Sequence, residues 1–165
     1  AAFEEMTGQD SPGFAIDGCS APNFATTLNG LARAMVRFAT ARDDAGDARE
    51  RAAARLRDAM RRHPHLVAGE GRACTELMRV CKEPVALKTG AEGYFVAIAP
   101  TRGLGIALKI TDGSFRGANC TIAALLVRLG LLDADHPVTR RFVNAPVVNR
   151  RKIETGLIKP VDGLI

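Results

Sequence analysis

The amino-acid sequence predicts an α+β protein in which a three-stranded antiparallel meander is flanked by helices. Three observations support this fold class. Apolar residues recur at helical spacing through the first half, the spacing changes to strand-like alternation from residue 85, and a strongly apolar helix follows the strands. The 165 residues, with 47% hydrophobic content, are enough for a single domain, 1–165, with a core of its own.

The N-terminal part is predicted to contain one loop and two helices. Residues 1–23 are rich in Gly and Pro, which is typical of a loop. Apolar residues have helical spacing over 28–39, and a second helix is predicted over 47–63, where the Asp47 side chain can cap the first turn. The apolar stripe of this second helix is narrow and rich in alanine: Ala48, Ala52, Leu56 and Met60.

A short helix over 73–82 precedes the strands, which are predicted over 85–89, 93–99 and 103–111. The connection "PTRG" between the last two is short enough for an antiparallel hairpin. The middle strand is apolar on both faces, which predicts helices on both sides of the sheet. However, we expect this chain to contain too little helix to cover both sides of the sheet. An apolar helix over 118–132 follows, and the tail is polar with a short apolar end.

The composition argues against two classes of partner. A net charge of +5 could suit an acidic partner or nucleic acid, but seven Phe, one Tyr and no Trp provide few rings for base stacking, so we expect no nucleic-acid partner. No apolar run reaches the roughly 18 residues that a span requires, so no membrane partner is expected either. Four scattered cysteines favour reduced thiols in a cytoplasmic protein.

The tripeptide Lys88-Thr89-Gly90 lies at the end of the first predicted strand. It is either a solvated lysine at a strand end or a catalytic lysine, as on the K-T-G strand that penicillin-binding proteins and class A β-lactamases pair with an S-x-x-K nucleophile. That nucleophile is absent from these 165 residues, because no serine is followed by a lysine three positions later. The serines are Ser11, Ser20 and Ser114.

The cysteines differ in what their surroundings indicate. Cys74 and Cys81 are not at a usual zinc-ligand spacing and can both line a helix, whereas Cys120 belongs to an apolar helix and is expected in the core. Cys19 follows Asp17 by two positions in a loop bounded by Gly and Pro. A loop thiol that packing does not require is the better candidate for a metal ligand.

Four segments resemble one family when they are taken together and in order. "DGCSAPNF", "HPHLVAGEGRACTELM", "LKTGAEGYF" and "GLGIALKITDG" are similar to the asparaginase II family, the rhizobial-type L-asparaginases. The resemblance covers about residues 4–132 and is carried less by the tail. It implies a fold like that of serine β-lactamases and glutaminases, and hydrolysis of L-asparagine to L-aspartate and ammonia.

The resemblance also implies roles for individual residues. Lys88 matches a catalytic lysine that assists a serine-lysine pair, and Cys19 matches a zinc ligand. Asp17 matches a carboxylate beside that metal in the amino-acid pocket, and Cys74 matches a cysteine near the substrate. Thiolate is a good zinc ligand, and a lysine kept deprotonated by neighbouring positive charge can accept a proton from serine.

The same resemblance implies that the chain corresponds to the C-terminal half of an enzyme about twice as long. The serine nucleophile and the other zinc ligands belong to the N-terminal half in that family. We therefore expect an incomplete zinc ligand set and an isolated chain without activity, with an N-terminal half or a homo-oligomer as partner. The alternative is a non-catalytic binding or assembly domain derived from the same fold.

Overall fold

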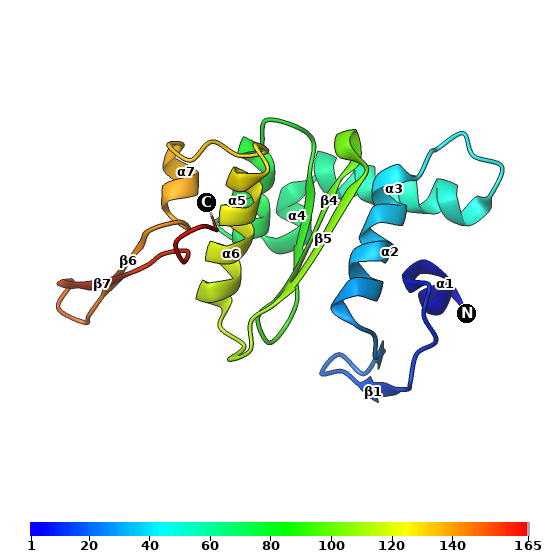
Figure 1. Cartoon of the computed structure of the whole chain (residues 1–165), viewed down its shortest axis with the longest axis horizontal. Helices are drawn as coiled ribbons and strands as arrows, with labels where there is room; N and C mark the ends of the chain where they lie inside the picture. The colour runs from blue at the N-terminus through cyan, green and yellow to red at the C-terminus, as the bar shows by residue number, and fades with distance from the viewer. Residues whose placement is uncertain (165) are drawn as a thin grey trace.

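The computed structural model describes residues 1–164 and confirms a mixed α+β protein built on a three-stranded antiparallel sheet (Figure 1). The strands are β3 (Ala86–Thr89), β4 (Tyr94–Ala99) and β5 (Leu104–Lys109), in the order β3-β4-β5. Each is paired antiparallel to the next, as the sequence predicts. A single 3₁₀ turn, Pro100–Arg102, joins β4 to β5.

Seven helices surround or extend this sheet in the part of the chain that is described. They are α1 (Ala2–Thr7), α2 (Leu28–Thr40), α3 (Ala48–Arg62), α4 (Pro64–Ala68), α5 (Ala73–Val80), α6 (Phe115–Arg128) and α7 (Pro137–Arg140). The prediction of α2, α3, α5 and α6 is confirmed, although α6 begins and ends three to four residues earlier than the apolar run suggested. Asp47 caps α3 as predicted, since its carboxylate accepts a hydrogen bond from the Glu50 backbone N–H.

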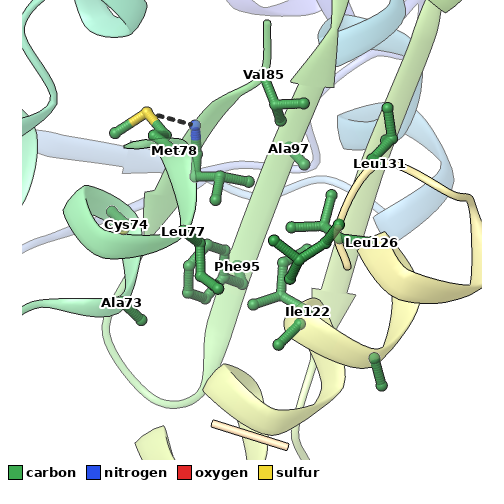
Figure 2. Packing of buried hydrophobic residues seen from close by; sticks show 14 of the residues in the cluster. Ala73, Cys74, Leu77, Met78, Val85, Phe95, Ala97, Ile122, Leu126 and Leu131 are labelled. Atoms are coloured by element: carbon green, nitrogen blue, oxygen red, sulfur yellow. Dashed lines mark hydrogen bonds between the residues drawn. The ribbon is translucent and has the colours of Figure 1, made fainter. Parts of the chain in front are cut away.

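One face of the sheet forms the main hydrophobic core with α5 and α6. The strand register places Leu87, Phe95 and Leu108 on this face, where all three are buried. Figure 2 shows the Phe95 ring between Leu77 of α5 and Ile122 of α6. Phe95 buries a large apolar area at the centre of the protein, so this contact anchors both helices to the sheet.

Helix α2 covers the opposite face by crossing β4 and β5. The approach is close at Gly105 of β5, where an added Cβ would lie 2.4 Å from the Val36 backbone nitrogen and 2.5 Å from the Ala32 carbonyl oxygen. The chain thus supplies helices to both sides of the sheet, and the expectation of too little helix is wrong. A 13-residue helix laid directly on a small sheet is enough, because glycine removes the side-chain layer between them.

The buried face of α3 differs from the predicted stripe. Ala53, Ala54 and Arg57 are buried, whereas Leu56 is 59% exposed. The Arg57 guanidinium donates hydrogen bonds to the carbonyl oxygens of residues 38, 39 and 41 at distances of 3.0, 3.1 and 2.9 Å. Arg57 thereby satisfies the otherwise unpaired carbonyls at the end of α2, which explains why a charged residue occupies the buried face.

The N-terminal segment contains a hairpin where the sequence predicted only a loop. Strands β1 (Phe14–Ile16) and β2 (Pro22–Phe24) pair antiparallel, and their turn is closed by a 2.9 Å hydrogen bond from the Asp17 N–H to the Ala21 carbonyl oxygen. Strands of three residues are too short to show an alternating pattern, which is why the hairpin was not predicted.

The C-terminal segment forms a second hairpin, from β6 (Ala145–Val148) and β7 (Glu154–Ile158). Figure 1 shows it projecting from the body beside α6 and α7. The sequence predicted only a polar tail here. Within residues 1–164, no helix is both long enough and apolar enough to cross a membrane.

Candidate active site

Strand β3 places Lys88 at the surface, at the edge of the sheet. Lys88 pairs with Val96 in the strand register and therefore lies on the α2 face, where its side chain is exposed. Its Nζ donates a hydrogen bond to the Thr89 carbonyl oxygen at 2.6 Å. The ammonium is thus held beside the backbone of its own strand, at the C-terminal end of β3.

Cys74 lies on the other side of the same strand. It comes from α5, is buried, and its Sγ accepts a hydrogen bond from the Thr89 backbone N–H at 3.2 Å. One helical turn later, the Met78 sulfur accepts from the Leu87 backbone N–H at 3.3 Å (Figure 2). Two sulfur atoms of α5 therefore satisfy two N–H groups of the edge strand that no neighbouring strand can pair.

The burial of Cys74 determines its protonation. Loss of solvent raises the pKa of the thiol, and the Thr89 N–H and the nearby charge of Lys88 oppose this shift only in part. Cys74 is therefore a neutral thiol at neutral pH, suited to accepting a hydrogen bond and poorly suited to nucleophilic attack.

Gly90 completes the tripeptide and is required by packing within the chain. A Cβ at this position would lie 2.3 Å from Cδ1 of the Tyr94 ring. The Gly90 N–H donates to the Tyr94 carbonyl oxygen at 2.8 Å, which continues the β3–β4 ladder by one residue. The Tyr94 ring therefore occupies the space that a side chain at position 90 would need.

A cavity of about 310 Å³ opens beside Cys74 and Thr89. Its wall includes the exposed side chains of Arg72 and Phe115 and the half-buried side chain of Asn119. The cavity thus combines a cation and an amide with an apolar ring, at the face of β3 opposite to Lys88. Cys74, which was predicted to lie near the substrate, therefore borders a cavity that a small molecule could enter.

Asp17 and Cys19 occupy the turn of the β1–β2 hairpin, and both are exposed. The Cys19 thiol donates a hydrogen bond to Oδ2 of Asp17, with 3.4 Å between sulfur and oxygen. The turn is tight because Ser20 adopts a left-handed conformation with φ of 68°. The structure therefore brings the predicted carboxylate and the predicted thiol ligand side by side.

A groove of about 800 Å³ connects this hairpin to the β3–β4 turn. Asp17, Asn23 and Phe24 line one wall, and Gly90 and Tyr94 line the other. Glu92 at the tip of that turn has a left-handed backbone with φ of 56°, and its carbonyl oxygen accepts a hydrogen bond from the Lys109 ammonium. The groove thus joins the "DGC" and "KTG" motifs, which are about 70 residues apart in the sequence.

The four predicted site residues form two pairs. Asp17 and Cys19 are in contact, and Lys88 and Cys74 are both bonded to the backbone of Thr89, Lys88 to its carbonyl oxygen and Cys74 to its N–H. Within residues 1–164, no hydrogen bond or ion pair joins one pair to the other. The groove brings Asp17 near Gly90, whereas Cys74 opens into the separate cavity on the far side of β3.

A model of the family described as L-asparaginase II matches residues 1–160. The chain belongs to the L-asparaginase II family. This match covers nearly the whole chain, including the tail that the four motifs left uncovered, and confirms the resemblance seen in the sequence. No curated protein matches the chain.

The candidate site includes residues that sequence reasoning missed. Met78 supplies the second sulfur against β3, and Tyr94 and Lys109 form one wall of the groove. Strand register was the available signal for the last two, because Tyr94 pairs with Lys109 at the end of the β4–β5 ladder. No sequence pattern indicated the Met78 contact, which depends on the distance between α5 and β3.

The residues present do not make a complete metal centre. In the part of the chain that is described, no group of three or more His, Cys, Asp or Glu side chains lies close enough to hold a metal ion. Asp17 and Cys19 provide two adjacent donors, whereas a structural zinc has four ligands and a catalytic zinc three from the protein. All four cysteines are free.

Proposed function

We propose that this chain is the C-terminal portion of an L-asparaginase that hydrolyses L-asparagine to L-aspartate and ammonia. Family membership over residues 1–160 supports an asparaginase-type function. The observation that carries the finer proposal is the groove that unites the Asp17 turn with the end of the Lys88 strand. The exposed hairpin on one wall leaves this site accessible to a further protein segment.

The nucleophile of the proposed reaction is a serine outside these 165 residues, paired with its own lysine in an S-x-x-K segment. Its Oγ attacks the side-chain amide carbon of asparagine, the C–N bond breaks, and ammonia leaves after taking up a proton. Water then hydrolyses the ester and releases aspartate. The absence of an S-x-x-K segment from the printed sequence supports placing this serine elsewhere.

Lys88 provides positive charge and a proton-transfer group at the edge of this site. Its position on an edge strand allows Nζ to leave the Thr89 carbonyl and approach a serine brought to the strand from outside. The opposite side of the strand is fixed by Cys74. We therefore assign Lys88 a catalytic role and Cys74 a place beside the substrate pocket, where it holds the strand.

Asp17 is proposed to bind the α-ammonium group of the amino acid. It is an exposed carboxylate at the wall of the groove, and the structure gives it no ion pair with another described residue. Cys19 beside it is proposed to donate one thiolate to a zinc ion whose remaining ligands belong to the N-terminal half. The two donors present do not fit a zinc centre alone, so no step of the reaction is assigned to the metal.

The fold is proposed to be part of a serine β-lactamase-like architecture. The antiparallel sheet, with α2 on one face and α5 and α6 on the other, supports this proposal.

A second candidate function is a non-catalytic binding or assembly domain of the same family. The missing nucleophile and the incomplete ligand set favour it. The protein is proposed to act in the cytoplasm, in keeping with its free thiols.

The two functions are separated by the coding sequence immediately upstream and by co-expression. An upstream S-x-x-K segment, and asparagine hydrolysis when that segment and this chain are produced together, support the enzyme. An unrelated or terminated upstream frame, with no ammonia released under any pairing, supports the binding domain. Lys88→Met is the informative variant for the paired proteins, and Lys82→Met is its matched control, because Lys82 is an equally exposed lysine that precedes β3 and lies outside the K-T-G tripeptide.

A further inference from the structure

The cavity beside Cys74 and Thr89 is separate from the groove in which the proposed reaction takes place. It has a volume of about 310 Å³ and lies on the face of β3 opposite to Lys88, whereas Asp17 lines the groove. A cavity of about 150 Å³ is enough to hold benzene, so this one has room for a single ring that bears one polar group. Its size therefore suits a small ligand.

The wall of the cavity carries an uncompensated positive charge. The Arg72 side chain is exposed and forms no ion pair with another residue of the described chain. Burial raises the pKa of the Cys74 thiol, and the charge of Arg72 is one of the influences that oppose this rise, so the charge acts at the cavity. Within residues 1–164, no Asp or Glu lines the cavity. An anion is therefore the complementary ligand, and a guanidinium can bind a carboxylate through two parallel hydrogen bonds.

A side-chain amide provides a second polar group. Asn119 of α6 lines the cavity, is half-buried, and forms no side-chain hydrogen bond with another described residue. Its amide has two donor N–H groups, which can bond to a carboxylate oxygen. The amide and the Arg72 guanidinium thus give the cavity donors for both oxygens of one carboxylate.

Two aromatic rings supply the apolar part of the lining. Phe115, the first residue of α6, is 48% exposed, and Phe142 is half-buried. The Arg141 guanidinium lies over the Phe142 ring, 5.7 Å from its centroid, and is itself bonded to Glu76 at 3.1 Å. The Phe142 ring is therefore held in place by its neighbours. Because aromatic rings pack favourably on other aromatic rings, a flat ring is the apolar group that matches this lining.

We propose that this cavity binds a small aromatic carboxylate, at a site distinct from the asparagine groove. The carboxylate accepts hydrogen bonds from Arg72 and Asn119, and the ring packs against the two phenylalanines. Inorganic phosphate would match the charge but leave both rings uncovered, and a neutral aromatic amide would leave the guanidinium without a counter-charge. This site is independent of asparagine hydrolysis, because the lining of the cavity alone defines it.

A ligand in this cavity also contacts the residues that hold the strand of Lys88. Cys74 and Thr89 both line the cavity, and the Thr89 N–H donates to Sγ of Cys74 at 3.2 Å. The carbonyl oxygen of the same threonine accepts the hydrogen bond from Lys88 Nζ. A ligand that binds only when this end of β3 is closed lowers the population of the open strand. Occupancy of the cavity is thereby coupled to the position of Lys88 on the other side of the strand.

The test is a titration of the purified 165-residue chain with benzoate, followed by heteronuclear NMR. We expect saturable shifts of the Cys74, Thr89 and Asn119 amide signals, a dissociation constant of about 1 mM, and no shift at Asp17. Acetate lacks the ring and benzamide lacks the charge, so each should bind about tenfold more weakly or worse. At ten times the dissociation constant, benzoate should slow exchange of the Thr89 amide proton by about tenfold.

Variants of the lining separate the charge from the ring. Arg72→Gln should weaken benzoate binding by about tenfold or more, because a hydrogen-bonded charge pair is lost. Phe115→Ala should weaken the binding of benzoate but not that of acetate. The matched control is Arg116→Gln, since Arg116 is an exposed arginine next to Phe115 that does not line the cavity, and it should bind benzoate as the wild type does. Circular dichroism should be unchanged in both arginine variants, because both positions are exposed.

Several results would overturn the proposal. It is wrong if benzoate shifts do not saturate, if they centre on the groove, if acetate or benzamide binds as tightly, or if Arg72→Gln keeps the wild-type affinity. Loss of benzoate binding when the chain is produced with its upstream segment would also overturn it, by assigning the cavity to that segment. None of these results depends on ammonia release, so failure here is distinguishable from failure of the proposed asparaginase function.

Discussion

The backbone N–H of Thr89 donates a hydrogen bond to Sγ of Cys74, with 3.2 Å between nitrogen and sulfur. This bond ties the strand of the predicted catalytic lysine to helix α5. It satisfies an N–H group that faces away from β4 and would otherwise be unpaired inside the protein. Cys74 thus has a structural task that family resemblance alone did not indicate.

Removing the Cys74 sulfur should destabilise the chain more than removing a comparable core sulfur. Cys74→Ala leaves the Thr89 N–H without an acceptor, which costs about 1–3 kcal/mol, in addition to the loss of packing. Cys120→Ala is the matched control, because Cys120 is equally buried and receives no hydrogen bond in the described chain. Urea unfolding gives the two free energies, and exchange of the Thr89 amide proton should be faster only in Cys74→Ala. Equal losses and unchanged exchange would show that the bond is unimportant.

The close contact between α2 and β5 makes a second prediction. Gly105→Ala adds a Cβ within 2.4 Å of the Val36 nitrogen, so the helix must move away from the sheet. Overpacking of this kind costs about 1–3 kcal/mol, to be measured by thermal or urea unfolding. Gly156→Ala in β7 is the control, since its Cβ would meet no atom within 4 Å and should leave stability nearly unchanged. An unchanged stability of Gly105→Ala would contradict the close packing of α2 on β5.

Acid should weaken the junction between β3 and the C-terminal end of α6. The Arg102 guanidinium, and next the Thr101 hydroxyl, lower the pKa of Glu83 from its ordinary value of 4.5 to about 2. The folded-state pKa is the lower one, so the stabilisation is present above pH 4.5 and is lost as the pH falls towards 2. In Glu83→Gln the melting temperature should depend less on pH within this window. Glu154→Gln, at an exposed carboxylate without an ion pair in the described chain, should leave that dependence unchanged. An unchanged acid profile in Glu83→Gln would refute the assignment.

The thiols should differ strongly in reactivity with a disulfide reagent such as dithionitrobenzoate. Cys19 is exposed, whereas burial raises the pKa of Cys81 to about 12 and also raises that of Cys74. At neutral pH one thiol per chain should therefore react rapidly, and the others only on unfolding. Absorbance of the released thiolate measures this, and Cys19→Ser should abolish the fast phase. A fast phase that persists in Cys19→Ser would mean that the buried cysteines are accessible.

Local patterns in the sequence were sufficient for much of the fold. The short apolar runs over 85–89 and 93–99 and the alternation over 103–111 predicted the meander, and the Asp47 cap marked the start of α3. The buried face of α3 could not be predicted, because Arg57 belongs to it only through the carbonyls at the end of α2. The two peripheral hairpins were missed because their strands are only three to five residues long and bury little apolar surface, which leaves no clear alternation in the sequence.

The candidate site shows the same division. Short motifs indicated Lys88, Asp17 and Cys19 because their residue types are chemically distinctive where they occur. The groove between Asp17 and Gly90 results from the placement of the β1–β2 hairpin against the β3–β4 turn, which no local pattern specifies. Likewise, glycine at position 90 is explained by the Tyr94 ring, a neighbour across the turn.

Ammonia release from L-asparagine is the most direct test of the central claim, that this chain is the Lys88-bearing portion of an asparaginase whose serine lies elsewhere. The purified 165-residue chain should release none, and the same chain produced with its upstream S-x-x-K segment should yield equimolar ammonia and aspartate. Lys88→Met should reduce that rate by roughly 10²-fold or more, the usual contribution of a proton-transfer group. Turnover by the isolated chain, or a paired enzyme unaffected by Lys88→Met, would contradict the account.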